Sequence, residues 1–524
     1  MEKGTNGMTT ATAERHPRGL YVLFGTEMWE RFSFYTVNAM LSLYLRDSVQ
    51  GFSFTNAHAA SVVSWYNGFV YFTPLLGGLL ADRLLGFRKA IVIGGIFFMA
   101  GHALLAVPNS LMVAYIALCC LVIGNGFFKP NVSSMVGNLY PEGSHLKDKA
   151  YVIFYMGINV GAAAAPIVAK FIQPRWGFHP AFFMGAIGML ISVILFLGNQ
   201  KHVRHADRMK GKSDPKAVAV TEDLPPVNEE ARIMGEVPEW KRIMALIVVF
   251  LIVIVFWMIF HQNSITFTFW AADHTQWRWI QGGGILSNAI NPLWIIILSL
   301  PLVGFWGWLD KRGMEPSTPT KMMFGMILTG LSMIVLYFGA RQNGYTAPVF
   351  RVEKADASGT WVSIAPEARQ HLGITTPGKE IEVEEKGKLV KKTVWRANVA
   401  GTLVKNDFVR LDRYENGQVF ASPTAKASLW WLIFGYMVIS LGELMLSPMG
   451  LALVSKVAPV RMRGLMMGGW FAATAIGNKL TGIAGFWDLW SHTRFFLTLS
   501  IMAFVMAVVL FVLLRPLKRA MPGV

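Results

Sequence analysis

Long hydrophobic segments recur along almost the whole chain. Each is about 17–25 residues long, which is the length that crosses a bilayer as a helix. The pattern predicts an all-α polytopic membrane protein with about twelve transmembrane helices. The expected spans cover residues 20–45, 57–81, 90–107, 111–137, 150–172, 180–198, 243–262, 286–309, 322–340, 428–453, 464–485 and 494–515.

Two polar segments interrupt this rhythm. Residues 199–242 carry mixed charge and separate six expected spans from six. Residues 343–427 alternate polar and apolar positions, and Asn416-Gly417 between two such runs favours a type I′ hairpin. We therefore expect a cytoplasmic linker in the first segment and a small, mostly β outer domain in the second.

These interruptions divide the chain into seven expected parts. Residues 1–19 contain no apolar core and no cleavage pattern, so they are expected to be a tail rather than a signal peptide. The parts are the cytoplasmic tail 1–19, an N-terminal six-helix bundle 20–198, the linker 199–242, the first three helices of a C-terminal bundle 243–342, the β-rich domain 343–427, the last three helices of that bundle 428–516, and a cytoplasmic tail 517–524.

Composition and charge agree with a membrane protein. Hydrophobic residues make up 53% of the 524 residues and charged residues only 15%, against about a quarter in soluble domains. The net charge of +17 comes mainly from Lys and Arg on alternate loops, which places those loops and both termini in the cytoplasm. Topology and contact with membrane lipid explain this excess, so no nucleic-acid partner is expected. The outer domain holds no Asn-x-Ser/Thr sequon, which points to a bacterial inner membrane.

The first expected helix carries three charges in an apolar background. Glu27, Glu30 and Arg31 fall on one helical face, which Tyr35 and Asn38 extend. An ionisable residue at bilayer depth costs at least about 2.5 kcal/mol, so this face borders protein or a water-filled cavity. One reading is a buried structural ion pair. The other is a proton site, because one carboxylate remains after Arg31 is paired and can take up a proton.

Other spans contain matching polar groups. Lys129 lies too deep in its helix for easy snorkelling, and Tyr155 and Asn159 are one helical turn apart. Asn291 precedes a proline, and Glu443 lies mid-span with no Lys or Arg in the same span. Either asparagine alone could serve interhelical contact, whereas an unpaired acid such as Glu443 indicates a functional site.

Four motifs together carry a family resemblance. They are Glu27-x-x-Glu30-Arg31-Phe32-x-x-Tyr35, the loop GGLLADRLLGFRK (77–89), FYMGINVG (154–161) and GELMLSP (442–448). The chain resembles the proton-dependent oligopeptide transporter family of the major facilitator superfamily. The resemblance implies two six-helix bundles, alternating access, and import of di- and tripeptides together with protons, with no cofactor and no metal.

The resemblance also implies residue roles. Arg31 and Lys129 would bind the peptide carboxylate, and Glu443 with Asn159 and Asn291 would bind its amino terminus. Trp257 would stand with other aromatic residues in the walls. The implied substrate-binding set is Arg31, Tyr35, Tyr71, Lys129, Tyr155, Asn159, Asn291, Glu443 and Trp470; the proton-coupling set is Glu27, Glu30, Arg31, Lys129 and His261; the inner gate is Asp82, Arg83 and Arg88.

The chain departs from the family at the outer gate. Relatives commonly place an arginine where this chain has Asn38 and an acid where it has His261, and Ser64 stands at the position of the histidine of animal relatives. In one interpretation His261 titrates and opens the gate. In the other, a neutral His261 is hydrogen-bonded to Asn38 for packing.

Other function classes remain as alternatives. A transporter of another small anion or metabolite, such as nitrate or an amino acid derivative, would use the same fold, but Glu443 argues against a simple anion. A membrane enzyme would need a nucleophile with a base or a metal cluster, and no H-E-x-x-H motif is present. We therefore expect a monomeric transporter, not an enzyme, whose partners are di- and tripeptides, protons and membrane lipid.

Overall fold

The computed structural model describes residues 16–140, 146–207, 236–278, 282–385, 387–399, 401–459 and 462–522. Most of the predicted N-terminal tail lies outside the described residues. So do residues 208–235, the greater part of the predicted linker.

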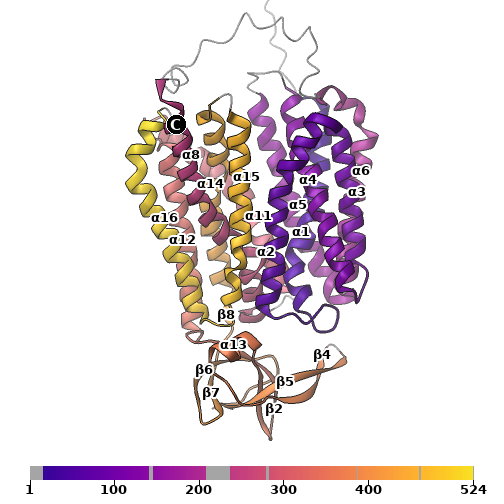
Figure 1. The fold of residues 1–524 in the computed structure, drawn as a ribbon, viewed down its shortest axis with the longest axis vertical. Coiled ribbons are helices and arrows are strands. Elements are labelled where there is room, and N and C mark those ends of the chain that lie inside the picture. Colours follow the sequence, from indigo (N-terminus) through magenta and orange to yellow (C-terminus); the bar gives the residue numbers. More distant parts are fainter. Residues whose placement is uncertain are drawn as a thin grey trace, which may run out of the picture.

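Long helices lie side by side and form the body of the molecule (Figure 1). The first half contributes α1 (Arg18–Arg46), α2 (Asn56–Leu80), α3 (Phe87–Leu105), α4 (Leu111–Asn138), α5 (Leu146–Trp176) and α6 (Phe178–Gly198). A π-helical turn η1 (Ala81–Leu85) joins α2 to α3, and the short turns η2 (Gln200–His202) and η3 (Arg204–Ala206) follow α6.

The second half repeats this arrangement with more interruptions. Its long helices are α8 (Glu239–Phe260), α11 (Ile290–Asp310), α12 (Thr318–Gln342), α14 (Leu429–Val457), α15 (Arg463–Leu480) and α16 (His492–Ala520). Short elements extend them: η5 (His261–Ser264), α9 (Thr266–Phe269) and η6 (Trp270–His274) after α8, α10 (Gly283–Leu286) and η7 (Ser287–Ala289) before α11, and η9 (Thr481–Phe486) after α15.

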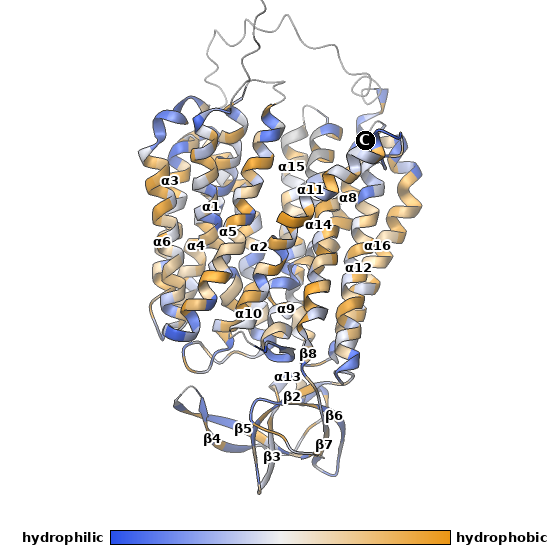
Figure 2. Cartoon of the chain, turned by 180° about the vertical axis from the view of Figure 1, so that it is seen from behind, coloured by the Kyte–Doolittle hydropathy of each residue, from blue (hydrophilic) through white to orange (hydrophobic). Residues whose placement is uncertain are grey.

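The helices of the body have the length and hydrophobicity of membrane-spanning segments. Ten helices of the described chain are long and apolar enough to cross a membrane. The long helices α1 and α15 are not among them, and α1 carries the three charges Glu27, Glu30 and Arg31. Large apolar side chains such as Leu300 and Phe511 are exposed, and much of the helical ribbon is coloured hydrophobic in Figure 2. The protein is therefore a multi-pass membrane protein.

Buried polar side chains hold the break between α8 and α9. At η5 the helix tightens, and backbone groups lose regular helical partners there. The Gln262 side chain bonds across this break: its amide nitrogen donates to the carbonyl oxygen of Thr481 in η9 (3.1 Å), and its amide oxygen accepts the hydroxyl of Thr266 (2.9 Å). Both partners are buried, whereas His261 Nε2 and Asn263 Oδ1 of the same segment have no hydrogen-bond partner in the described chain.

Residues 349–423 form a sheet outside the helical body. Its strands are β2 (Val349–Asp356), β3 (Gly359–Ser363), β4 (Lys379–Glu385), β5 (Lys388–Val399), β6 (Phe408–Glu415) and β7 (Gln418–Pro423), with α13 (Pro366–His371) after β3. The strand order is β3-β2-β6-β7-β5-β4, and β3 also pairs with β5, so five strands close into a small barrel with β4 at its edge. Buried apolar residues fill it, including Val352, Val362, Trp395 and Val409.

A tight turn joins two strands of this barrel, and one short strand pairing connects the barrel to the helical body. Asn416 and Gly417 form the two-residue loop between β6 and β7, and both have the positive φ (51° and 74°) that a type I′ turn requires. The chain returns to the body through β8 (Ala427–Ser428), which pairs in parallel with β1 (Thr275–Gln276). In Figure 1 the sheet lies at the end of the helices opposite the C-terminus.

Candidate functional site

The three charges of α1 form one closed cluster. Arg31 is ion-paired with Glu30, to which its Nη2 donates at 2.6 Å, and its Nε lies 3.3 Å from Glu27 Oε1. All three side chains are at most 3% exposed. Spacing along the helix explains the contact between Glu27 and Arg31, because residues i and i+4 face each other. One guanidinium therefore neutralises two carboxylates, which leaves the cluster one positive charge short.

Two residues that the sequence analysis did not select complete this cluster. Asn125 of α4 accepts a hydrogen bond from Arg31 Nη2 (3.2 Å) and donates to the carbonyl oxygen of Val70 (2.7 Å), so it links α1, α2 and α4. Tyr66 has a buried hydroxyl with no hydrogen-bond partner in the described chain and interacts electrostatically with Glu30. A signal for Asn125 was present in the sequence, since it lies one turn before Lys129 on the same helix.

Lys129 supplies the second cation. Its ammonium lies 4.7 Å from the ring centroid of Tyr71, a cation–π contact between α4 and α2. It also interacts electrostatically with Arg31 and Glu27. Lys129 and Tyr71 are half-buried, whereas Glu27 and Arg31 are fully buried. A half-buried ammonium in a helix of this body must border a water-accessible space, because lipid would not solvate it.

Glu443 is held from the other half of the molecule. Its carboxylate accepts a hydrogen bond from Asn291 Nδ2 (3.0 Å), and the same amide group donates to Ser440 Oγ (2.9 Å). No ion pair of Glu443 with a basic residue occurs among the described residues. Glu443 also interacts electrostatically with Tyr35 and Tyr155 of the first half. Lys129 of α4 in the first half and Glu443 of α14 in the second half thus carry opposite charges.

Asn159 is used within its own helix. Its Nδ2 donates to the carbonyl oxygen of Tyr155 (2.9 Å), four residues earlier on α5. This bond is intrahelical and does not join α5 to another helix. Tyr155 remains half-buried on the side that interacts with Glu443.

Aromatic side chains surround these polar groups. The rings of Trp257 and His261 stack with centroids 5.1 Å apart, and His261 lies 5.2 Å from Tyr71 of α2. Trp470 of α15 packs directly over Gly450 of α14, where a Cβ atom would lie 1.9 Å from the indole ring. Only glycine leaves room for the indole at this position.

The hydrogen bond expected between Asn38 and His261 is not formed. Asn38 Oδ1 and His261 Nε2 are both buried, and neither has a hydrogen-bond partner in the described part of the chain. The packing interpretation, which consisted of this bond, is therefore wrong, and the gate interpretation loses the Asn38 contact that protonation of His261 was expected to weaken. Stacking against Trp257 holds the imidazole instead, because η5 turns the ring along the tryptophan.

The expected inner-gate residues lie around η1. Arg88 donates to Gln200, and Asp207 Oδ1 accepts the backbone N–H of Phe87 (2.8 Å) at the start of α3. Asp82 is half-buried, and among the described contacts none joins it to Arg83 or Arg88. Asp207, which belongs to the predicted linker, was not selected from the sequence. A carboxylate at a helix N-terminus stabilises it through unpaired N–H groups.

Three contacts join the two halves at the end that carries the sheet. Arg46 at the end of α1 is ion-paired with Asp273 of η6, and Asn56 Nδ2 donates to Asp488 Oδ1 (2.7 Å). Lys479 Nζ of α15 lies 3.3 Å from Ser64 Oγ of α2. These contacts hold the sheet-side ends of the two halves together in this conformation.

Metal chemistry finds no support among the described residues, which contain no group of three His, Cys, Asp or Glu side chains able to hold a metal ion.

Comparisons with known proteins agree over nearly the whole chain. It is 28% identical to the uncharacterized transporter YclF of Bacillus subtilis (strain 168), with 97% of this chain and 96% of that protein covered. It is 27% identical to the di-/tripeptide transporter of Lactococcus lactis subsp. lactis (strain IL1403), with 98% and 99% covered. The crystal structure of a peptide transporter POT in complex with sulfate superposes with a TM-score of 0.74 at 25% identity and covers 99% of this chain and 97% of that one.

A family model matches most of the chain as well. The model described as PTR2, POT family, matches residues 88–222, 226–373 and 403–486. The chain therefore belongs to the POT family of transporters.

Proposed function

We propose that this protein is a proton-coupled symporter that imports di- and tripeptides by alternating access. The observation that carries the proposal is the opposition of charges across the two halves. Arg31 and Lys129 lie on one side and Glu443 on the other. Relatives named di-/tripeptide transporter and dipeptide and tripeptide permease support the same substrate class.

A short peptide is a zwitterion and needs both ends neutralised in a site of reduced dielectric. Lys129 and Arg31 would bind its carboxylate by charge-assisted hydrogen bonds. Glu443 would bind the ammonium, and Asn291 already orients that carboxylate. Tyr35, Tyr71, Tyr155, Asn159 and Trp470 would complete the pocket, since aromatic faces tolerate many side chains.

Proton coupling would arise in the α1 cluster. Glu27 and Glu30 compete for the single guanidinium of Arg31. Protonation of either carboxylate would weaken its hold on Arg31 and release the guanidinium toward the peptide carboxylate. His261 would contribute to coupling from the second half, and Asp82, Arg83 and Arg88 would form the inner gate. The membrane potential would add about 2.3 kcal/mol per charge for each 100 mV.

The finer architecture belongs to the same proposal. Twelve spanning helices would form two bundles, one from residues 20–198 and the other from residues 243–342 and 428–516. The two bundles would rock around a midplane site. The tails 1–19 and 517–524 and the linker 199–242 would be cytoplasmic, and 343–427 would face outward from a bacterial inner membrane. The protein would act as a monomer in lipid. A carrier of nitrate or another small anion fits less well, because Glu443 would repel the anion.

Reconstitution tests the proposal. With an inward proton gradient across liposomes, labelled dialanine should accumulate, and unlabelled di- and tripeptides should compete while free alanine and nitrate should not. Dissipating the gradient with a protonophore is the matched control. Equal uptake with and without a gradient would reject proton coupling, and inhibition by nitrate alone would reject peptide as the substrate.

A further inference from the structure

A cavity lies between the sheet domain and the outer ends of both helical halves. Its volume is 620 Å³, within the range of about 300–1,000 Å³ that is typical of small-molecule sites. It lies on the outer side of the contacts that join the halves, and Arg46, Asp273, Asn56 and Asp488 line it.

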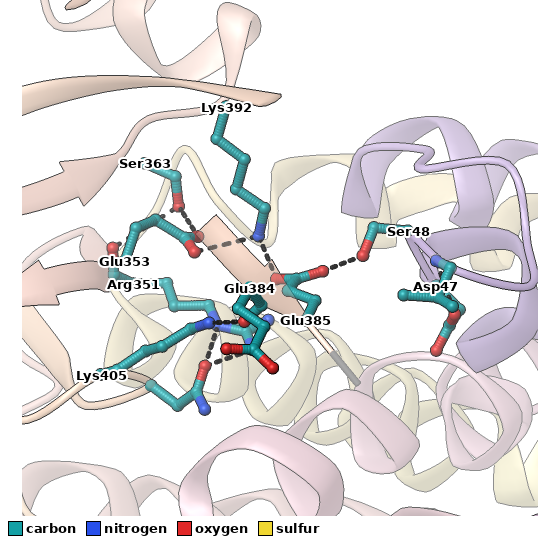
Figure 3. A network of polar contacts seen from close by, with 11 residues as sticks. Asp47, Ser48, Arg351, Glu353, Ser363, Glu384, Glu385, Lys392 and Lys405 are labelled. Carbon is teal, nitrogen blue, oxygen red and sulfur yellow. Dashed lines mark hydrogen bonds and ion pairs between the residues drawn. The ribbon is translucent and has the colours of Figure 1, made fainter. Parts of the chain in front are cut away.

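The sheet domain is fixed over this cavity by contacts to the first helical half. Figure 3 shows Ser48, between α1 and α2, donating to Glu385 at the end of β4. Lys392 of β5 holds Glu385 in turn and also bonds Glu353 (3.0 Å), so the network reaches into the barrel. A second contact runs from the Thr55 hydroxyl to Glu367 of α13 (3.3 Å). The wall of the cavity is therefore anchored.

The cavity floor contains buried polar atoms without partners. Arg46 uses Nη2 for Asp273, whereas its Nη1 has no hydrogen-bond partner in the described chain. Asn56 uses Nδ2 for Asp488, whereas its Oδ1 has none there. Because buried polar atoms are nearly always hydrogen-bonded, a donor and an acceptor without partners on two residues that line one cavity point to a polar ligand.

The charges of the lining indicate which class of ligand. Four basic residues (Arg46, Arg351, Lys391 and Lys392) and four acidic residues (Asp47, Asp273, Glu353 and Asp488) line the cavity. An anion or a cation alone would meet as many repulsive as attractive groups. A molecule with both charges can place each end against its opposite.

We propose that this cavity is an outer binding site for a short zwitterionic peptide, whose carboxylate binds Arg46 and whose ammonium binds Asp488 and Asn56. The inference rests on the proposed function of peptide transport and adds a loading step before the central site. A carboxylate on Arg46 competes with Asp273, so a bound peptide weakens the ion pair between α1 and η6. Loading thereby favours opening of the outer side.

Equilibrium binding to the purified full-length protein tests the outer site separately from transport. The background variant is Lys129→Ala with Glu443→Gln, which disables the central site. Labelled dialanine should still bind this background, with lower affinity than wild type. Adding Asp488→Asn should weaken the remaining binding at least tenfold, because the side chain still accepts from Asn56 but has lost its charge. Binding of N-acetyl-dialanine should not change.

Matched controls keep the result specific. Glu415→Gln removes a charge from the sheet domain at a residue that does not line the cavity. It should leave binding unchanged. Arg46→Lys keeps the charge but removes the planar guanidinium that can bind Asp273 and a carboxylate at once, so it should also weaken binding. This variant takes the place of Asp488→Asn if Asp488→Asn does not fold. Absence of dialanine binding in the background variant, or full binding after both substitutions, would overturn the outer site. Loss of gradient-driven uptake by wild type would instead overturn the proposed function.

Discussion

The two helical halves hold their buried acids in different ways. In the first half Glu27 and Glu30 share Arg31 on the same helix, and none of the three is more than 3% exposed. In the second half Glu443 is half-buried and held by the neutral amide of Asn291. A carboxylate next to a guanidinium can exchange that cation for a proton, whereas Glu443 is bound by a neutral amide and lacks the cation that a peptide ammonium would supply. Under the proposed function, the first half would carry proton coupling and the second half would bind the ammonium.

The largest effect is expected for Glu443→Gln. The variant keeps a side chain that can contact Asn291 but has no charge for the peptide ammonium. Dialanine uptake into liposomes should fall at least about 100-fold, as expected for the loss of a buried charge-assisted bond. N-acetyl-dialanine has no ammonium, so its uptake should fall much less. An equal loss for both substrates would break the assignment of Glu443.

A change in the first half should affect coupling rather than binding. Glu30→Gln fixes that site in a neutral state and leaves Arg31 with Glu27 alone. Gradient-driven accumulation should fall about 10–100-fold, whereas dialanine counterflow without a gradient should persist. Full accumulation by Glu30→Gln would remove the contrast between the halves.

Packing in the second half offers a test independent of charge. A Cβ atom on Gly450 would overlap Trp470, so Gly450→Ala should lower the free energy of unfolding by about 1–3 kcal/mol and reduce uptake. Gly307→Ala is the matched control, because a Cβ atom there meets no heavy atom within 4 Å. Thermal unfolding in detergent measures both. Equal melting temperatures for the two variants would show that Trp470 moves freely.

The last prediction concerns an acid outside the spanning helices, Asp488, and affects stability rather than uptake. Burial raises the pKa of Asp488 from 3.8 to about 6, opposed by the hydrogen bond from Asn56 and by Arg46. The folded protein therefore binds more protons here than the unfolded chain does between about pH 4 and 6. Its stability should fall as the pH rises through that range, by of order 2–3 kcal/mol from this group. Asp488→Asn should remove this dependence, as thermal unfolding at pH 4.5 and 7.5 can show; an unchanged difference between the two pH values would contradict it.

Much of the helical architecture could be predicted from the sequence. Hydrophobic length locates a spanning helix without knowledge of its neighbours, because the bilayer sets the length. The loop at Asn416-Gly417 was also predictable, since few dipeptides tolerate positive φ at both positions. Asn125 could not be singled out in the same way. Its role depends on the approach of α4 to α1, and a polar residue in a span has several possible partners.

What the sequence by itself determined is therefore local or set by the solvent: the spans, the shared face of Glu27, Glu30 and Arg31, the hairpin turn and the motifs of the family. Only the tertiary structure decided which distant groups meet. It paired Glu443 with Asn291, left Asn38 and His261 without the bond expected between them, and placed Arg46 against Asp273 below the outer cavity. The physical reason is range: helix periodicity and bilayer thickness act within one segment, whereas these contacts depend on how the helices pack and on where the sheet domain closes over them.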